Sequence, residues 1–257
     1  MRVPMLMLAA AGAAVLAPAV LPAPAAVLAP AVLPAPAAVL APVALPSPAA
    51  AVPHRERSVA RGKGAVAASD LLAGLGKCTQ VSRGRYRTDA GSPATVPVCG
   101  TRDAVYWKAD LDIDCDGRTT AHCNHRTDPL FAATTAFPQS DGRHLNAETL
   151  PYIVLPAPSR IWNPRAYGVR GGSVAAVVYR GRVRYAVVGD TGPRDIIGEV
   201  SYATARSLGL RADPLDGGAD SGVTYIVFRN SRVHPIEDHA AAVAAGRRLA
   251  KLLVANR

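Results

Sequence analysis

The chain has 257 residues, a formal net charge of +10 and 22 prolines. The length allows one domain or two, but Met1–Ala51 is almost entirely Ala, Val, Leu and Pro, so a packed domain must begin later. The charge does not indicate a nucleic-acid partner. From Cys78 to Arg232 there are 19 Lys and Arg against 15 Asp and Glu, and the arginines are spread singly.

The first segment carries a repeat of twelve residues, because Ala14–Ala25 recurs letter for letter at Ala26–Ala37. Its prolines would break a membrane-spanning helix, so we expect no membrane anchor. Arg2 followed by an apolar stretch predicts an export signal within residues 1–51. The alternatives are a wrongly chosen start and a low-complexity expansion without function. Residues 52–68 are typical of a basic linker or propeptide, and 69–257 form one folded domain.

The four cysteines all fall in the first part of that domain, and none forms a CxxC pair of the kind that binds zinc. In an exported protein they predict two disulfides. Three pairings are possible. Short local loops favour Cys78–Cys99 and Cys115–Cys123.

Secondary structure is predicted to be mainly β from Cys78 onward, where short apolar or alternating runs are separated by Gly, Pro, Asn and Asp. Helices are expected at 69–77, at 201–208 before Gly209, and at 236–254 with Pro235 in the first turn and packed against the sheet or barrel. A tight turn over 180–182 joins two of the strands. The predicted strands are Ala104–Ala109, Tyr152–Leu155, Val174–Tyr179, Arg184–Val188 and Thr224–Phe228.

Two acids stand out at strand ends. Asp190 follows a buried apolar strand, and Glu199 follows Ile196-Ile197 and a glycine. One carboxylic acid and one carboxylate are what cleavage of a glycosidic bond requires. The structural alternative is that Asp190 caps a turn and Glu199 caps or abuts the helix that begins near Ser201. Spacing alone leaves both interpretations open.

The stretch GDTGP…IIGEVSYATA resembles the active-site region of the family 75 glycoside hydrolases, the fungal and actinobacterial chitosanases. Four other stretches resemble blocks of that family in the same order, over about Cys78 to Arg232. The resemblance implies a secreted endo-chitosanase that hydrolyses β-1,4 bonds between glucosamine units, with inversion and without a cofactor. Asp190 and Glu199 would be its catalytic pair, and 69–257 its catalytic domain. The other stretches are DLDIDCDG, PYIVLP, VAAVVYRGRVRYAVVGD and GVTYIVF.

A second resemblance concerns the fold. The pattern of strand, D-x-G-P, strand and acid is similar to the centre of double-psi β-barrel proteins that act on cell walls. It implies a six-stranded double-psi-like barrel with short flanking helices and a C-terminal helix, with Glu199 as general acid and Asp190 as the base that activates water. The same fold leaves two alternatives for function. These are a non-catalytic, expansin-like polysaccharide-binding module and a lytic enzyme that acts on peptidoglycan.

A run of acids precedes Gly117. If the run is extended, Asp112, Asp114 and Asp116 share one face with Asp110, and such a face would bind a polycationic polysaccharide. The alternative is a solvated loop in which one acid caps a turn. The run begins like a calcium loop, but Cys123 stands where a bidentate Glu should close it, so we predict no metal.

Two further residues, Thr191 and Trp162, are predicted to contact substrate, with Trp162 at the surface. The expected partner is chitosan. We expect no nucleic acid, no membrane partner and a monomer.

Overall fold

The protein is described by a computed structural model over residues 65–256. The predicted export signal and most of the predicted linker lie outside the described residues. Within residues 65–256, no helix is both long and apolar enough to cross a membrane.

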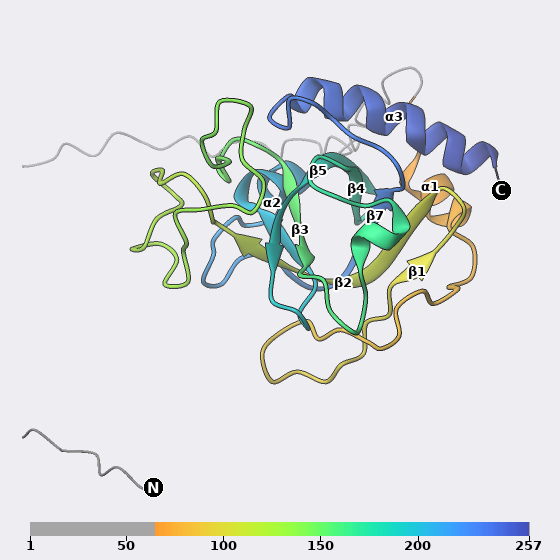
Figure 1. Cartoon of the computed structure of the whole chain (residues 1–257), viewed down its shortest axis with the longest axis horizontal. Helices are drawn as coiled ribbons and strands as arrows, with labels where there is room; N and C mark the ends of the chain where they lie inside the picture. The colour runs from red at the N-terminus through yellow and green to blue at the C-terminus, as the bar shows by residue number, and fades with distance from the viewer. Residues whose placement is uncertain (1–64, 257) are drawn as a thin grey trace, which may run out of the picture. The chain divides into compact units, whose positions relative to one another are not determined.

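Six strands close into a barrel in the order β2-β6-β3-β5-β4-β7, and β7 pairs back with β2 (Figure 1). The predicted six-stranded barrel is therefore confirmed. Two of its pairs, β2 with β6 and β3 with β5, are parallel and join strands distant in sequence, as the predicted double-psi-like connection requires. The strands are β1 (Cys99–Gly100), β2 (Ala104–Asp114), β3 (Tyr152–Pro156), β4 (Val174–Tyr179), β5 (Arg182–Gly192), β6 (Glu199–Ser201) and β7 (Ala219–Phe228).

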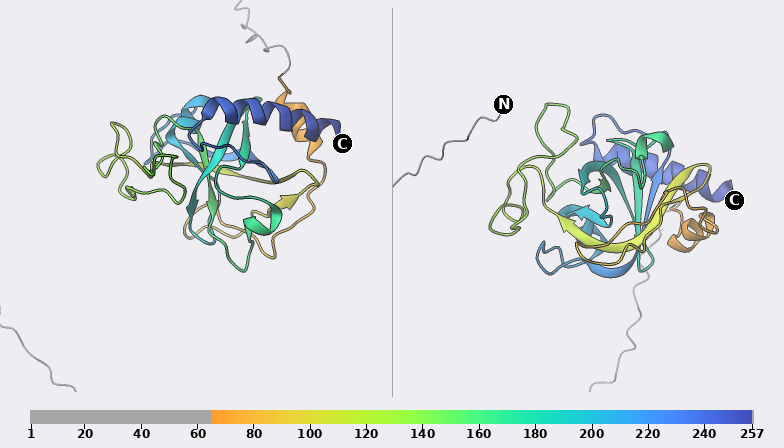
Figure 2. Two further views of the ribbon diagram at one scale, coloured as in Figure 1. Left: turned by 45° about the horizontal axis from the view of Figure 1, so that its top comes forward. Right: turned by 60° about the horizontal axis from the view of Figure 1, so that its bottom comes forward.

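Strand β2 is long enough to serve two neighbours. Residues 104–111 pair with β7, the register shifts between Ala109 and Leu111, and residues 112–114 pair with β6. A shift of this kind bends a strand and turns it toward a new partner. The bend carries the acidic end of β2 to the side of β6. Figure 2 shows β2 curving around the barrel.

The hairpin between β4 and β5 follows the predicted turn. Tyr179 pairs with Arg182, and the two residues between them, Arg180 and Gly181, have φ angles of 44° and 76°. Two positive φ values are what a tight two-residue hairpin loop needs. Strand β4 has the predicted bounds, whereas β2, β3, β5 and β7 are longer than predicted and β6 was not predicted. Ile196, expected in a strand, forms only an isolated bridge to Arg87.

Three helices flank the barrel, namely α1 (Ala68–Gly74), α2 (Tyr202–Leu208) and α3 (His239–Ala255), and a short 3-10 helix, η1, spans Pro164–Tyr167. Helix α2 ends at Gly209, as predicted. Helix α3 begins later than predicted, because Asp238 is its N-cap and accepts a hydrogen bond from Ala241 N. Pro235 thus precedes the helix. Helix α3 packs along β5 and β4, as expected (Figure 1).

Both predicted disulfides are present, Cys78–Cys99 and Cys115–Cys123, with Cα atoms 5.2 and 4.9 Å apart. The second fastens the start of the long segment between β2 and β3, which extends to one side of the barrel (Figure 1).

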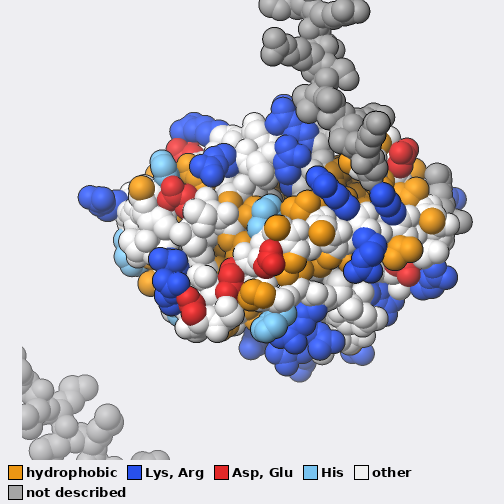
Figure 3. All heavy atoms as spheres, turned by 90° about the horizontal axis from the view of Figure 1, so that it is seen from above, with side chains coloured by type: hydrophobic (Ala, Val, Ile, Leu, Met, Phe, Trp, Pro, Cys, Tyr) orange, Lys and Arg blue, Asp and Glu red, His pale blue; other side chains and the backbone are white. Residues whose placement is uncertain are grey.

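The distribution of basic side chains on the surface agrees with the scattered arginines of the sequence. Figure 3 shows the face that carries α3, where Lys and Arg side chains lie in separate groups with apolar side chains between them. No single basic stripe crosses this face.

Candidate active site

Asp190 lies near the end of β5, where a bulge sets its direction. In the parallel pair of β3 and β5, Ile153 pairs with Val188. The next β3 residue, Val154, pairs with Asp190, so Gly189 is an extra residue in β5. A bulge kinks a strand and re-aims the side chain beside it. Here that side chain is the Asp190 carboxylate.

We expect Gly189→Ala to destabilise the domain. A Cβ at this position would lie 2.6 Å from Tyr152 Cβ and 2.8 Å from Leu145 Cδ1, and both side chains are fully buried. Overpacking of this kind costs about 1–3 kcal/mol, which lowers the melting temperature by roughly 2–12 °C. Gly84→Ala is the control, because its Cβ would meet Ile161 at an ordinary 3.7 Å. Thermal unfolding followed by circular dichroism compares the two, and equal melting temperatures would contradict the expectation.

The Asp190 side chain is buried and held by the backbone. It is 5% exposed, and its Oδ1 accepts hydrogen bonds of 2.7 Å from the N–H groups of Ala136 and Thr191. Burial raises the pKa of Asp190 above its ordinary value and outweighs the opposing effects of these two hydrogen bonds and nearby His144. Two N–H donors stabilise the ionised carboxylate. Nothing in the local sequence signals the contact with Ala136, which is 54 residues away.

Glu199 is the first residue of β6, which lies between β2 and β3. Its carboxylate is half-buried against Gly192, where a Cβ would lie 2.6 Å from Oε2. Burial, together with the charges of Asp112, Asp116 and Asp190, raises the pKa of Glu199 to about 7. The side chain is therefore surrounded by other carboxylates.

Strand β3 runs between the two acids. Val154 pairs with Asp190 on one side. On the other side Ile153 pairs with Val200, which places Val154 opposite Glu199. Paired residues project to the same face of a sheet, and two inter-strand spacings of about 4.8 Å separate the two backbones by about 10 Å. The structure thus brings the two predicted acids together on one face.

The structural alternative for these acids fits only in part. Thr191 N–H does cap Asp190 as in a local turn, but Ala136 N–H reaches the same oxygen from a distant segment. Helix α2 is capped by Ser201, whose hydroxyl accepts from the helix, and not by Glu199. No capping role accounts for the Glu199 carboxylate.

Asp114 and Asp116 lie beside the pair and are tied into the fold. Asp114 Oδ1 accepts from Asp116 N, and Asp116 Oδ1 accepts from Ala132 N, both at 2.6 Å. The hydroxyl of buried Tyr152 donates to the Asp116 carbonyl at 2.9 Å. Burial, opposed by the hydrogen bond from Ala132 N and aided by the charge of Asp190, raises the pKa of Asp116 to about 6. Burial, followed by the charge of Asp116, also raises the pKa of Asp114 well above its ordinary value.

The predicted alternation along β2 is confirmed on its apolar side, where Leu111, Ile113 and Cys115 are buried. The acidic side is not uniformly solvated, which corrects the idea of one open anionic face. Asp112 is exposed and paired in register with the first residue of β6, whereas Asp110 is only 6% exposed. The register of β2 shifts at Asp110, and the resulting bend buries the Asp110 side chain.

The prediction that Trp162 lies at the surface is wrong. Trp162 is 3% exposed, packs edge-on against Trp107 with ring centroids 6.4 Å apart, and lies 6.2 Å from Tyr167. Its loop folds over the core, so this tryptophan contributes to stability. Thr191 is half-buried, and its backbone contributes to the site by holding Asp190.

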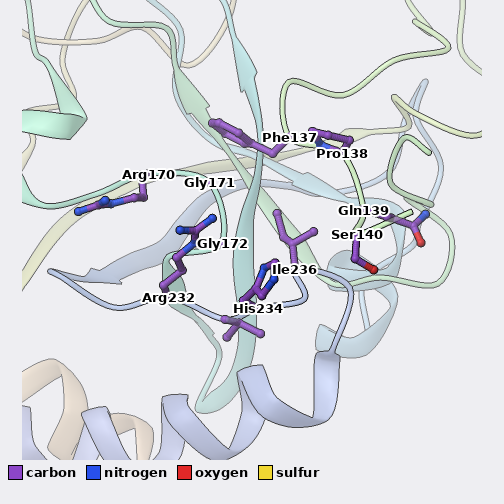
Figure 4. A pocket seen from close by; sticks show the side chains of 11 residues that line it. Phe137, Pro138, Gln139, Ser140, Arg170, Gly171, Gly172, Arg232, His234 and Ile236 are labelled. Atoms are coloured by element: carbon purple, nitrogen blue, oxygen red, sulfur yellow. The ribbon is translucent and has the colours of Figure 1, made fainter. Parts of the chain in front are cut away.

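A hollow of about 360 Å³ lies next to the segment that holds Asp190, and Figure 4 shows it. Phe137 and Ile236 form apolar walls, and Arg170, Arg232 and His234 line it as well. Its two guanidinium groups would repel a cationic ligand. None of the predicted site residues lines it, and the carboxylates around Glu199 remain the candidate active site for a cationic substrate.

A buried, hydrogen-bonded carboxylate and a second carboxyl with a raised pKa, held on one face of a rigid barrel, form the acid pair typical of glycoside hydrolases. The sequence identifies the family of glycoside hydrolases. Residues 111–250 match the family described as fungal chitosanase of glycosyl hydrolase group 75. The chain belongs to this family and is a glycoside hydrolase, which confirms the resemblance seen in the sequence.

Individual relatives in the comparison are named as endo-chitosanases. An endo-chitosanase of Aspergillus fumigatus is 31% identical over 167 residues, which cover 60% of this chain and 69% of the relative. Endo-chitosanase B of Aspergillus oryzae is 28% identical over 178 residues, which cover 62% and 74%. Among solved structures, the Streptomyces papain inhibitor is matched with a TM-score of 0.27 and 18% identity, over 48% of this chain and 94% of that chain.

Proposed function

We propose that this glycoside hydrolase is an endo-chitosanase that cleaves β-1,4 bonds between glucosamine units, with Glu199 as general acid and Asp190 as general base. The observation that carries the proposal is the placement of both acids on one face, on either side of β3. Membership of a chitosanase family and the names of the Aspergillus relatives support the substrate.

Hydrogen bonds support the role of Asp190 as base, and burial among carboxylates supports the role of Glu199 as acid. A general base must be ionised, and Asp190 Oδ1 receives two backbone N–H groups that stabilise its charge. Among the described residues, no hydrogen bond uses Oδ2, which leaves that oxygen to accept a proton from water. A general acid must hold a proton, and half-buried Glu199 stands among carboxylates that disfavour its ionisation.

Charge supports a cationic substrate. Glucosamine units carry ammonium groups at mildly acid pH, and the carboxyl groups of Asp112, Asp114 and Asp116 lie around the acid pair. An ammonium group among them favours their ionised forms and is attracted to them in turn. Local charge outweighs the net charge of the protein within a Debye length of about 10 Å. In this proposal the carboxylates of this region attract the polymer.

Release of reducing ends from soluble chitosan, compared with peptidoglycan, tests the proposed function. Hydrolysis of chitosan alone supports it. Binding to chitosan without hydrolysis would favour the expansin-like module, and hydrolysis of peptidoglycan alone would favour the lytic enzyme. No observation on the structure or the relatives favours either alternative.

We expect the first products to carry the α-anomeric configuration. Inverting glycosidases place their carboxyl groups about 6.5–9.5 Å apart to admit a water molecule, and retaining enzymes about 5–5.5 Å apart. Backbones about 10 Å apart, with both side chains on one face, suit the wider spacing. Proton NMR of the reaction within its first minutes distinguishes the anomers before mutarotation. A β-anomeric first product would contradict the role of Asp190 as base.

Export and organisation remain proposals. Residues 1–51 would act as the export signal, 52–68 as a basic linker or propeptide and 69–257 as the catalytic domain of a monomeric secreted enzyme. Both cysteine pairs are oxidised, which is typical of exported proteins. Mass spectrometry of the protein from culture medium would give the mature N-terminus.

A further inference from the structure

A second group of acids lies where β2 bends, next to the candidate catalytic pair. Asp110 and Asp112 come from β2, and Asp89 comes from the loop between α1 and β1. One carboxylate oxygen of each residue lies within 4.8 Å of an oxygen of each of the others. We call Asp89, Asp110 and Asp112 the triad.

The fold holds Asp89 in place. Its N–H donates to Ser92 Oγ at 3.0 Å, and the Thr88 hydroxyl donates to Asp89 Oδ2 at 2.9 Å. The residue two positions earlier, Arg87, accepts a backbone hydrogen bond from Ile197 N at 3.0 Å. This bond ties the loop to the segment that leads into β6, and so carries Asp89 to the acidic end of β2.

Asp110 supplies an independent sign that the triad takes a ligand. The side chain is 6% exposed, and its Oδ1 is inaccessible and has no hydrogen-bond partner among residues 65–256. Gly198 makes room for this oxygen, because a Cβ there would overlap it. The Tyr225 hydroxyl fixes the surrounding backbone by donating to the carbonyls of Asp110 and Gly198. Burying a carboxylate oxygen without a hydrogen-bond partner costs free energy, which indicates that a ligand bound to this oxygen is missing.

Among residues 65–256 the triad has no ion-pair partner. None of the ion pairs within the described part of the chain includes Asp89, Asp110 or Asp112. Arg87, the nearest arginine in sequence to Asp89, pairs with Asp195 instead. Three like charges this close repel one another, and a cation between them would remove the repulsion.

We propose that Asp89, Asp110 and Asp112 bind one calcium ion. Three carboxylates are hard oxygen ligands, which excludes the metals that prefer sulfur or imidazole. Calcium takes six to eight oxygens at about 2.3–2.6 Å in irregular arrangements, so one buried and two exposed carboxylates suit it, with water completing the shell. Magnesium demands a near-octahedral arrangement and retains most of its water. The ion would join the loop at Asp89 to β2, one strand away from Glu199.

This site differs from the calcium loop considered in the sequence. That motif ran from Asp112 to Asp116 and lacked its closing glutamate. In the structure Asp114 Oδ1 accepts the Asp116 N–H, and Asp116 Oδ1 accepts Ala132 N–H, so these two acids are already engaged. The third ligand comes from Asp89, more than twenty residues earlier in the chain.

Calorimetry and thermal unfolding of the purified protein, freed of metal with EDTA and without substrate, test the proposal. We expect one calcium ion to bind with a dissociation constant of about 0.1–1 mM, the range of weak extracellular sites. At 10 mM calcium the melting temperature should then rise by roughly 3–10 °C. No heat and no shift at that concentration would overturn the proposal.

Substitutions at single acids test whether the triad is the calcium site. Asp89→Asn removes an exposed ligand and should weaken calcium binding at least tenfold while the protein folds. Asp110→Asn removes a buried, unpaired charge, so it should keep or raise the melting temperature without calcium and abolish the response to calcium. Asp141→Asn, an exposed acid paired with Arg143, is the control and should respond like the wild type. An unchanged response in Asp89→Asn would place the ion elsewhere and refute the site.

Magnesium and the ammonium group of a sugar are the two alternatives to calcium as the ligand of the triad. A magnesium response as strong as that of calcium would overturn the assignment to calcium. Binding of glucosamine by the metal-free protein, weakened in Asp89→Asn and with no calcium binding, would show that the triad receives a sugar ammonium. That result would refute the proposed ion but leave the proposed hydrolase unaffected, because chitosan hydrolysis is measured separately.

Discussion

Glu199→Gln is expected to lower the turnover number on soluble chitosan at least 100-fold while the protein folds normally. Proton transfer from a positioned acid contributes about 10²–10⁴-fold, and an amide of nearly the same shape cannot supply it. In the wild type, burial together with the charges of neighbouring carboxylates raises the pKa of Glu199 to about 7, so the carboxyl carries its proton at mildly acid pH. Reducing-end release gives the kinetic constants, and circular dichroism checks the fold.

A substrate with an activated leaving group tests the role of Glu199 more sharply. A dinitrophenyl glycoside of a glucosamine oligomer needs no protonation to depart, so Glu199→Gln should lose much less activity on it than on chitosan. Glu148→Gln is the matched control, because Glu148 is also half-buried and its carboxylate binds the His122 ring at 2.8 Å. Near-wild-type turnover of chitosan by Glu199→Gln would remove Glu199 from the mechanism.

Asp190→Asn is expected to lose at least 100-fold in turnover on chitosan and on the activated glycoside alike. An amide cannot take the proton of the attacking water, and that step is required whatever the leaving group. The fold should survive, because the amide oxygen can still accept from the N–H groups of Ala136 and Thr191. The activated substrate thus separates the two roles, since only loss of the base affects both substrates equally.

Asp195→Asn is the control for that variant. Asp195 lies between the two acids in sequence but is exposed and paired with Arg87 at 3.5 Å. An exposed ion pair contributes about 0–1 kcal/mol, so its loss should leave both stability and turnover close to wild type. If Asp195→Asn were as impaired as Asp190→Asn, the loss would reflect a general effect of the segment and not proton transfer.

Much of the local structure could be predicted from the sequence. The bounds of β4 and the tight turn at Arg180-Gly181 follow from β-branched runs and from a glycine where φ must be positive. The end of α2 at Gly209 follows from the same freedom of glycine. The start of α3 was less well predicted, because Pro235 suggested the first turn while Asp238 makes the cap.

Short elements and buried aromatics could not be predicted in the same way. Strand β6 has three residues, and its pairing depends on β2 and β3 on either side of it. Trp162 has polar, proline-rich neighbours in sequence, yet it packs on Trp107, which comes from another part of the chain. Burial depends on such distant contacts, which local composition does not record.

The sequence by itself determined the class of fold, the family, and Asp190 and Glu199 as the candidate acids, because strand patterning and family motifs are local in the chain. It favoured the correct disulfide pairing, which the structure decided. The tertiary structure decided which groups meet. It brought Ala136 N–H to Asp190, opened a bulge at Gly189, and buried Asp110 beside Asp89. These contacts depend on strand register and loop closure between distant segments, which no stretch of local sequence encodes.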